Sequence, residues 1–189
     1  MKFIELPLEL KTARLRLKTL TPKEASNVVS YLLDSRSFFD KWGPAVEDEY
    51  FKSAFQKERL ITDIEKMEQG KLLRLWVFKN EDLEQPIGDI GFSQIIWGGF
   101  QSCFLGYKIA ERENGKGYAT EAIEAGVDYV FNQMKLHRIE ANIIPRNTAS
   151  IRVVEKLGFE KEGLAKRYLK INGCWEDHLH FVKWNQTVE

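Results

Sequence analysis

The segment from Asn114 to Glu121 holds the residue types best suited to ligand chemistry. Gly115 and Gly117 stand one residue apart, and glycine lets the backbone approach a ligand without a Cβ in the way. A helix-like run begins at Ala119. Its first N–H groups and its positive dipole end would point toward the same place. This arrangement predicts an anion site, most often one for phosphate.

Two known phosphate motifs do not fit this segment. The dinucleotide-binding pattern Gly-x-Gly-x-x-Gly fails because Thr120 stands at its last position. The Walker pattern fails because Gly117, rather than Ser or Thr, follows Lys116. A glycine-rich turn that binds no ligand therefore remains an alternative interpretation of these residues alone.

A second segment follows the expected strand His137 to Ile144 and contains Asn147, Ser150 and Leu157-Gly158-Phe159. With Asn114 to Ala119, it makes the chain resemble the GNAT family of acetyl-CoA-dependent acetyltransferases. The acetyl-CoA loop of that family reads Gln/Arg-x-x-Gly-x-Gly/Ala, and Asn114 to Ala119 matches it except at the first position. The second half of the family pattern, Asn-x-x-(Ser/Ala) followed by Leu-Gly-Phe, is matched throughout.

Flanking details are similar to the RimJ/RimL branch of that family, which acetylates protein N-termini and other amines. They are Thr12 to Leu17, Gly117 to Ala122, Glu155 to Phe159, and Glu162-Gly163. The resemblance implies acetyl-CoA as co-substrate, no metal, and an amine acceptor such as the N-terminus of a ribosomal protein.

Composition sets limits on the other classes of function. The 189 residues include 28 basic and 28 acidic side chains, a balance that does not indicate nucleic-acid or membrane binding. Cys103 and Cys174 lie on strand-like segments and are expected to be packed thiols rather than a disulfide or a metal site. Without a membrane-length apolar run or a signal-peptide core, we expect a cytoplasmic protein. Residues 1–189 are expected to form a single domain.

Hydrophobic periodicity predicts the element order β-α-α-β-β-β-α-β-α-β-β. The segment from Asp34 to Tyr50 reads as irregular, and Asn172-Gly173 predicts a hairpin between the last two strands. This order indicates an α/β (α+β) fold. The GNAT resemblance implies a mixed, mostly antiparallel central sheet of about seven strands flanked by about four helices.

The backbone amides from Gly115 to Ala119 are predicted to hold the diphosphate of acetyl-CoA. Lys116 either adds charge there or is a solvated loop lysine. By resemblance, the pantetheine arm lies along the strand that ends at Ile109, where that strand parts from the one ending at Ile144. The full set of predicted cofactor-binding residues is Ile109, Asn114, Gly115, Lys116, Gly117, Tyr118, Ala119, Thr120 and Asn147.

Asn147 and Ser150 admit two interpretations. Either both serve the start of the following helix, or Asn147 contacts the cofactor while Ser150 gives a proton to the leaving thiolate. The resemblance implies the second role. Other GNAT enzymes use a tyrosine one helical turn further on, but Val154 stands there.

A general base is less easily assigned. Asn142 occupies the position where some N-terminal acetyltransferases carry glutamate. Glu140 lies two residues earlier on the same strand face and is one candidate, and His178 on the last strand is another because histidine titrates near neutral pH. Structural roles remain open for both, as does deprotonation by water.

The acceptor end is predicted near an aromatic segment that carries Glu47, Asp48 and Glu49. It forms either a core between two helices or a groove in which Trp42 and an acidic rim attract a cationic amine. Trp97 either lines the same groove or stabilises a homo-oligomer.

The leading hypothesis is an N-acetyltransferase that acts on a protein N-terminal amine. The alternatives are an acetyltransferase for a small amine, such as a polyamine, an amino acid or a drug, and a non-catalytic CoA-binding module. The missing glutamate at Asn142 keeps the last alternative open.

Overall fold

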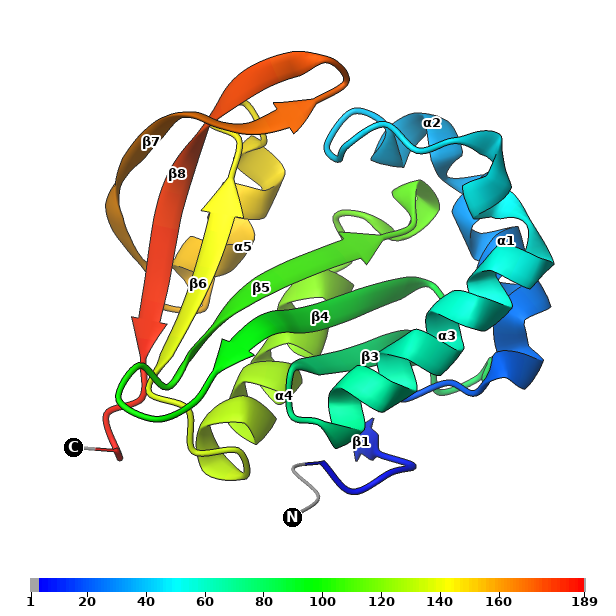
Figure 1. Ribbon diagram of the computed structural model, residues 1–189, viewed down its shortest axis with the longest axis horizontal. Coiled ribbons are helices and arrows are strands. Elements are labelled where there is room, and N and C mark those ends of the chain that lie inside the picture. The colour runs from blue at the N-terminus through cyan, green and yellow to red at the C-terminus, as the bar shows by residue number, and fades with distance from the viewer. Residues whose placement is uncertain (1–3, 189) are drawn as a thin grey trace.

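A computed structural model describes residues 4–188. Its centre is one eight-stranded sheet with the order β1-β2-β3-β4-β5-β6-β8-β7 (Figure 1). The strands are β1 (Glu9–Lys11), β2 (Leu15–Lys18), β3 (Leu72–Lys79), β4 (Gly88–Ile96), β5 (Ser102–Ile109), β6 (Arg138–Ile143), β7 (Glu160–Ile171) and β8 (Cys174–Trp184). Neighbours are antiparallel except β5 and β6, which run parallel.

Helices cover both faces of the sheet. The α-helices are α1 (Ala25–Asp34), α2 (Arg36–Phe39), α3 (Ser53–Glu68), α4 (Tyr118–Asn132) and α5 (Thr148–Lys156), and three short 3₁₀ turns span Pro22–Glu24, Asp48–Phe51 and Glu111–Glu113. The first two long helices, α1 and α3, lie on one face, and α4 lies on the other (Figure 1). The connection from β5 through α4 to β6 is a crossover, which parallel neighbours require.

The predicted mixed sheet and element order are confirmed, with one more strand and one more α-helix than expected among the described residues. β1 was missed because three residues carry no readable alternation, and α2 because it lies in the segment expected to be irregular. Cys103 is buried as predicted, but Cys174 is exposed, because it begins β8 directly after the Asn172-Gly173 turn.

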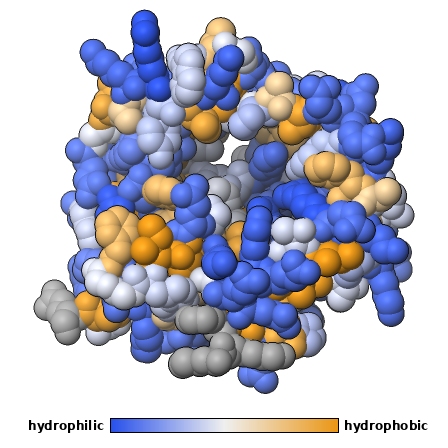
Figure 2. Space-filling view, in the orientation of Figure 1, coloured by the Kyte–Doolittle hydropathy of each residue, from blue (hydrophilic) through white to orange (hydrophobic). Residues whose placement is uncertain are grey.

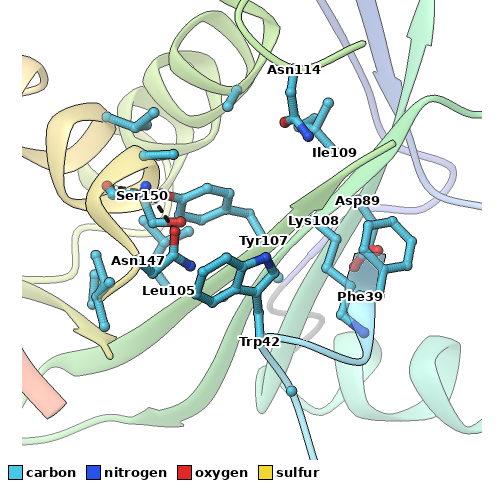
Figure 3. A pocket seen from close by; sticks show the side chains of 18 of the residues that line it. Phe39, Trp42, Asp89, Leu105, Tyr107, Lys108, Ile109, Asn114, Asn147 and Ser150 are labelled. Atoms are coloured by element: carbon cyan, nitrogen blue, oxygen red, sulfur yellow. Dashed lines mark hydrogen bonds between the residues drawn. The ribbon is translucent and has the colours of Figure 1, made fainter. Parts of the chain in front are cut away.

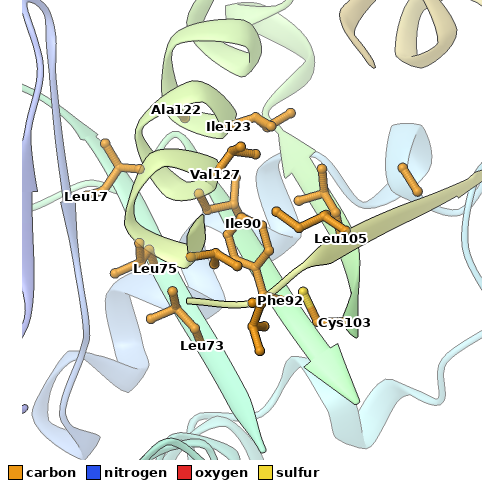
Figure 4. Packing of buried hydrophobic residues seen from close by; sticks show 14 of the residues in the cluster. Leu17, Leu73, Leu75, Ile90, Phe92, Cys103, Leu105, Ala122, Ile123 and Val127 are labelled. Carbon is orange, nitrogen blue, oxygen red and sulfur yellow. The ribbon is translucent and has the colours of Figure 1, made fainter. Parts of the chain in front are cut away.

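The main core lies between the sheet and α4 (Figure 4). Ala122, Ile123 and Val127 of α4 face Ile90 and Phe92 of β4, and all five side chains are buried. Ile123 and Val127 lie four residues apart, with Ala122 beside them, as expected for the apolar stripe of a helix that lies on a sheet. The packed stripe fixes the start of α4, and therefore the glycine loop before it, against the middle of the sheet.

Gly88 controls the distance between β4 and β5 at the carboxyl end of β5. A Cβ at Gly88 would lie 2.6 Å from the carbonyl oxygen of Lys108, so Gly88→Ala must push the strands apart. We expect this overpacking to lower the free energy of unfolding by about 1–3 kcal/mol, measured by denaturant titration. Gly163→Ala in β7 has no atom within 4 Å of the added Cβ and is the matched control. Equal stability of the two variants would contradict the prediction.

Candidate active site

The candidate site lies where two parallel strands part. β5 pairs with β6 only over three residues, Ser102 to Phe104 against Arg138 to Glu140. Beyond these pairs, β5 continues to Ile109 and β6 to Ile143. Beyond the last pair, the facing edges keep backbone groups that the sheet does not use. A cleft of about 840 Å³ opens there, and Figure 2 shows a hollow between hydrophilic side chains on this face of the molecule.

The glycine loop forms one end of the cleft. Gly115 and Gly117 have φ angles of 75° and 82°, and Gly117 precedes α4 without a side-chain cap. The first N–H groups of α4 are therefore not taken by a capping side chain. Arg14 holds the loop, since its Nη1 donates to the Lys116 carbonyl at 2.9 Å and its Nε to the Glu121 carboxylate at 2.7 Å.

The predicted cofactor-binding residues line the cleft with one exception. Those that line it are Ile109, Asn114, Gly115, Gly117, Tyr118, Ala119, Thr120 and Asn147. Lys116 does not. Its ammonium lies 2.8 Å from the Glu113 carboxylate, so its charge is used within the loop rather than directed at a ligand.

The family pattern also fits two residues earlier. Read from Arg112, the segment Arg112 to Gly117 satisfies Gln/Arg-x-x-Gly-x-Gly/Ala at every position. The structure favours this register because the two residues with positive φ, Gly115 and Gly117, then occupy both glycine positions. The mismatch at Asn114 came from setting the pattern two residues too late.

Asn147 and Ser150 meet Tyr107 on one wall of the cleft (Figure 3). The Asn147 side chain accepts the backbone N–H of Ser150 at 3.2 Å, so Asn147 does cap α5. The Tyr107 hydroxyl donates to the Ser150 carbonyl at 3.2 Å, and burial raises the pKa of Tyr107 to about 12. The Ser150 hydroxyl is not part of the cap, which leaves it available to a ligand. Sequence reasoning missed Tyr107, since it treated its strand only as apolar.

The two base candidates lie in different surroundings. Glu140 does not line the cleft, because its carboxylate is buried against Arg138 at 2.6 Å and His180 Nδ1 at 3.1 Å. His178 does line it, and its Nδ1 lies 3.1 Å from the Glu176 carbonyl oxygen. Because a carbonyl only accepts, Nδ1 must carry the hydrogen, which leaves a lone pair on Nε2 of the neutral ring. This environment favours His178 over Glu140 as a base.

Asn142 also lines the cleft, with an unused acceptor. Its Nδ2 donates to the Tyr168 hydroxyl at 3.2 Å, while its buried Oδ1 has no hydrogen-bond partner among residues 4–188. A buried carbonyl without a partner is costly, so Oδ1 is suited to accept an N–H from a bound molecule.

The predicted acidic rim is corrected by the structure. Trp42 lines the cleft, but Glu47, Asp48 and Glu49 do not. Asp48 pairs with Arg36 at 2.7 Å, and Glu49 pairs with Lys52. These exposed pairs cancel much of the negative charge that sequence counting assigned to a substrate groove.

Trp97 lies away from the cleft as well. Its Nε1 donates to the Gly70 carbonyl at 2.8 Å, and its ring packs on the main core. These contacts leave its predicted groove role unsupported. Its role in a homo-oligomer stays a prediction.

An arch spans one side of the cleft, from the β7–β8 hairpin to the loop after α2. Asn172, in the hairpin turn, donates to the Asp40 carbonyl. Arg146 donates to the Lys41 carbonyl at 3.4 Å and stacks over Trp42 with its Cζ 5.4 Å from the ring centroid. The arch therefore joins the last two strands to the helical layer near α2.

Four charged side chains on the remaining wall were not predicted. Arg59 (α3), Arg74 (β3), Asp89 (β4) and Lys108 (β5) all line the cleft, and Figure 3 shows Asp89 and Lys108 beside Phe39. The available signal was a charged residue within an apolar strand, as at Arg74 in β3. Among residues 4–188 no cluster of three or more metal-ligating side chains is found, and no helix is long and apolar enough to cross a membrane.

The profile of the acetyltransferase (GNAT) domain matches residues 14–160. The chain therefore belongs to the GNAT family of acetyltransferases. A probable N-acetyltransferase of Bacillus subtilis, YjcK, is 38% identical over 169 residues, which cover 89% of this chain and 93% of that one. The ribosomal protein uS5-alanine N-acetyltransferase of Escherichia coli is 35% identical over 170 residues, with coverage of 90% and 87%.

Solved structures agree with this assignment. The ribosomal-protein-S5-alanine acetyltransferase of Vibrio fischeri superposes with a TM-score of 0.92 at 30% identity, covering 96% of this chain and 99% of that one. RimJ of Mycobacterium smegmatis, solved with CoA-disulfide, superposes with a TM-score of 0.86 at 26% identity, with coverage of 92% and 83%. The predicted RimJ-like fold is thereby confirmed.

Proposed function

We propose that this acetyltransferase moves an acetyl group from acetyl-CoA to the α-amine of a protein N-terminus of the ribosomal-protein type. One observation carries the proposal. The glycine loop and the Ser150 hydroxyl lie on the same cleft, between strand edges that are free to bind an extended molecule. The E. coli relative acts on a ribosomal protein alanine, and a cytoplasmic location fits such an acceptor.

The cleft offers a binding group for each part of acetyl-CoA. The N–H groups from Gly115 to Ala119 suit the diphosphate, since a helix N-terminus favours anions. The free edge of β5 up to Ile109 suits the amide-rich pantetheine arm, whose amides can pair like those of an added strand. The M. smegmatis relative binds a form of CoA, which supports this assignment.

The transfer itself needs a base, a carbonyl-polarising donor and an acid. His178 Nε2 takes the proton of the acceptor ammonium, directly or through water. A free backbone N–H of β5 polarises the thioester carbonyl as the amine nitrogen attacks it. The Ser150 hydroxyl then protonates the departing thiolate as the carbon–sulfur bond breaks, and the second proton of the attacking nitrogen passes through water to restore the hydroxyl. Asn142 Oδ1 is placed to accept an N–H of the acceptor or of the pantetheine arm.

An acceptor panel tests the function. Purified chain with acetyl-CoA is offered N-terminal peptides, polyamines, free amino acids and lysine side-chain analogues, and CoA release is measured. Peptide acetylation at the α-amine supports the proposal. Turnover confined to small amines would replace it with the small-amine alternative, and acetyl-CoA binding without turnover would indicate a non-catalytic module.

The Gly117→Asp variant tests the diphosphate site. A carboxylate at this position would face the diphosphate, so we expect acetyl-CoA affinity to fall at least about tenfold, as for one adverse charge of about 1.4 kcal/mol. Gly117→Asn is the control, because Asn tolerates the left-handed backbone as Asp does and adds no charge. Calorimetry that gives both variants the same affinity would place the diphosphate elsewhere.

The Ser150→Ala variant tests the acid. The cap of α5 uses the Ser150 backbone N–H, so alanine keeps the cap and removes only the hydroxyl. We expect kcat to fall about 10²–10⁴-fold, the usual effect of one general acid, with acetyl-CoA affinity nearly unchanged. Tyr107→Phe is measured beside it. An unchanged kcat in Ser150→Ala together with a large loss in Tyr107→Phe would move the acid role to the tyrosine.

A further inference from the structure

The charged wall of the cleft contains a buried triad on its sheet side. The Asp89 side chain is buried and accepts from Arg74 Nη1 at 2.7 Å, while Arg74 Nε lies 2.9 Å from Asp63 Oδ2. Burial acts to lower the pKa of Arg74, but Asp89 and Asp63 together raise it. The arginine is thus firmly charged, and both aspartates already have a cation.

Two further cations have no such partner. Arg59 donates to the Tyr50 hydroxyl and to the Gln56 side-chain oxygen, and both of those groups are neutral. Lys108 stands over the Phe39 ring, with its Nζ 5.4 Å from the ring centroid. Neither side chain forms an ion pair with any residue from 4 to 188. Lys108 and Arg59 are therefore cations of this wall that are open to an anionic ligand.

Lys108 lies on β5, the strand whose end parts from β6. It lies directly opposite Asp89 in the β4–β5 register and next in sequence to Tyr107. Burial lowers the pKa of Lys108, whereas Asp89 raises it and Arg59 and Arg74 lower it further. Asp40, which lies outside the cleft lining, also raises this pKa. A half-buried cation that forms no ion pair gains from an anion that arrives with a ligand.

Acetyl-CoA is not the source of that anion. Under the proposed function its phosphates lie at the glycine loop, whereas Lys108 and Arg59 are on the side of the sheet covered by α1 and α3. The part of the pantetheine arm that reaches the reacting end carries no charge. The acceptor must therefore supply it.

Resting only on the acetyl-CoA site of the proposed function, we infer that the acceptor carries a carboxylate close to its reacting amine, and that Lys108 and Arg59 bind this carboxylate. Two sources have this chemistry. One is an acidic side chain near the start of a peptide, and the other is the α-carboxylate of a small amino acid. The same wall disfavours acceptors that are cationic beyond the amine, because a further positive charge would meet Lys108 and Arg59.

Calorimetry on the chain saturated with CoA tests this inference without turnover. The probes are two matched pairs: the amides of Ala-Glu-Ala and Ala-Gln-Ala, and free serine with serinamide. We expect the carboxylate member of at least one pair to bind about 10- to 100-fold tighter, the range for a charged hydrogen bond. The first pair reports a peptide side chain, and the second reports an α-carboxylate.

Lys108→Met should abolish this preference, because methionine keeps the unbranched stem and loses the charge. The substitution should weaken the binding of the carboxylate member of the pair and leave the binding of the amide member unchanged. Lys57→Gln, an exposed charge loss on the same helix as Arg59, should leave the preference intact. Arg59→Gln tests the same charge if Lys108→Met does not fold.

Equal binding within both pairs, or a preference that survives Lys108→Met, would overturn the inference. Acetylation of the same probes by the parent chain is scored separately. Absence of turnover with every amine would count against the proposed function. The carboxylate preference in binding is decided separately, by the calorimetry.

Discussion

The parting of β5 and β6 is the constraint on which the rest of the structure depends. β6 pairs with β8 along its whole length, and β5 keeps β4 as its partner. Each strand is thus held on its outer side, and only the inner edges lose their hydrogen bonds. Unpaired backbone groups away from water cost free energy. The fold carries that cost at a place where an extended ligand can supply the missing partners.

Helix α4 makes this parting useful. The crossover from β5 to β6 must pass over one face of the sheet, and the apolar stripe at Ala122, Ile123 and Val127 fixes its course. The N-terminus of α4 consequently lies at the open end of β5, where the strand edge is free. The anion site at the start of α4 and the free edge of β5 are adjacent because the crossover from β5 to β6 forms both.

Local signals in the sequence predicted this framework well. Gly115 and Gly117 need left-handed backbone, Asn147 caps a helix, and Asn172-Gly173 forms a tight turn; each of these effects acts within a few residues. Side-chain partners acted over longer separations and escaped prediction. Glu140 shares a strand face with Asn142 but is bound by His180 of β8, so its place on the strand did not reveal this neighbour.

The charged wall of the cleft could not be predicted from the sequence for the same reason. Counting acidic residues near Glu47 pointed to a negative groove, yet Arg36 and Lys52 neutralise that segment. The cations Arg59, Arg74 and Lys108 of the charged wall come from α3, β3 and β5, which are far apart in sequence. Only the register of β4 against β5 places Lys108 beside Asp89. When strand pairing brings charged residues together from distant parts of the sequence, no single segment of the sequence predicts the resulting charge pattern.

The arch differs in kind from the parted strands beneath it. It is made of surface contacts from Asn172 and Arg146 to the loop after α2, each worth about 0.5–1.5 kcal/mol. Breaking them disturbs no strand pair and exposes no core. Thermal motion of loops, on the scale of about nanoseconds to microseconds, is therefore enough to lift the arch and lower it again. Opening of the arch widens the passage over the cleft and leaves the strand pairs of the sheet intact.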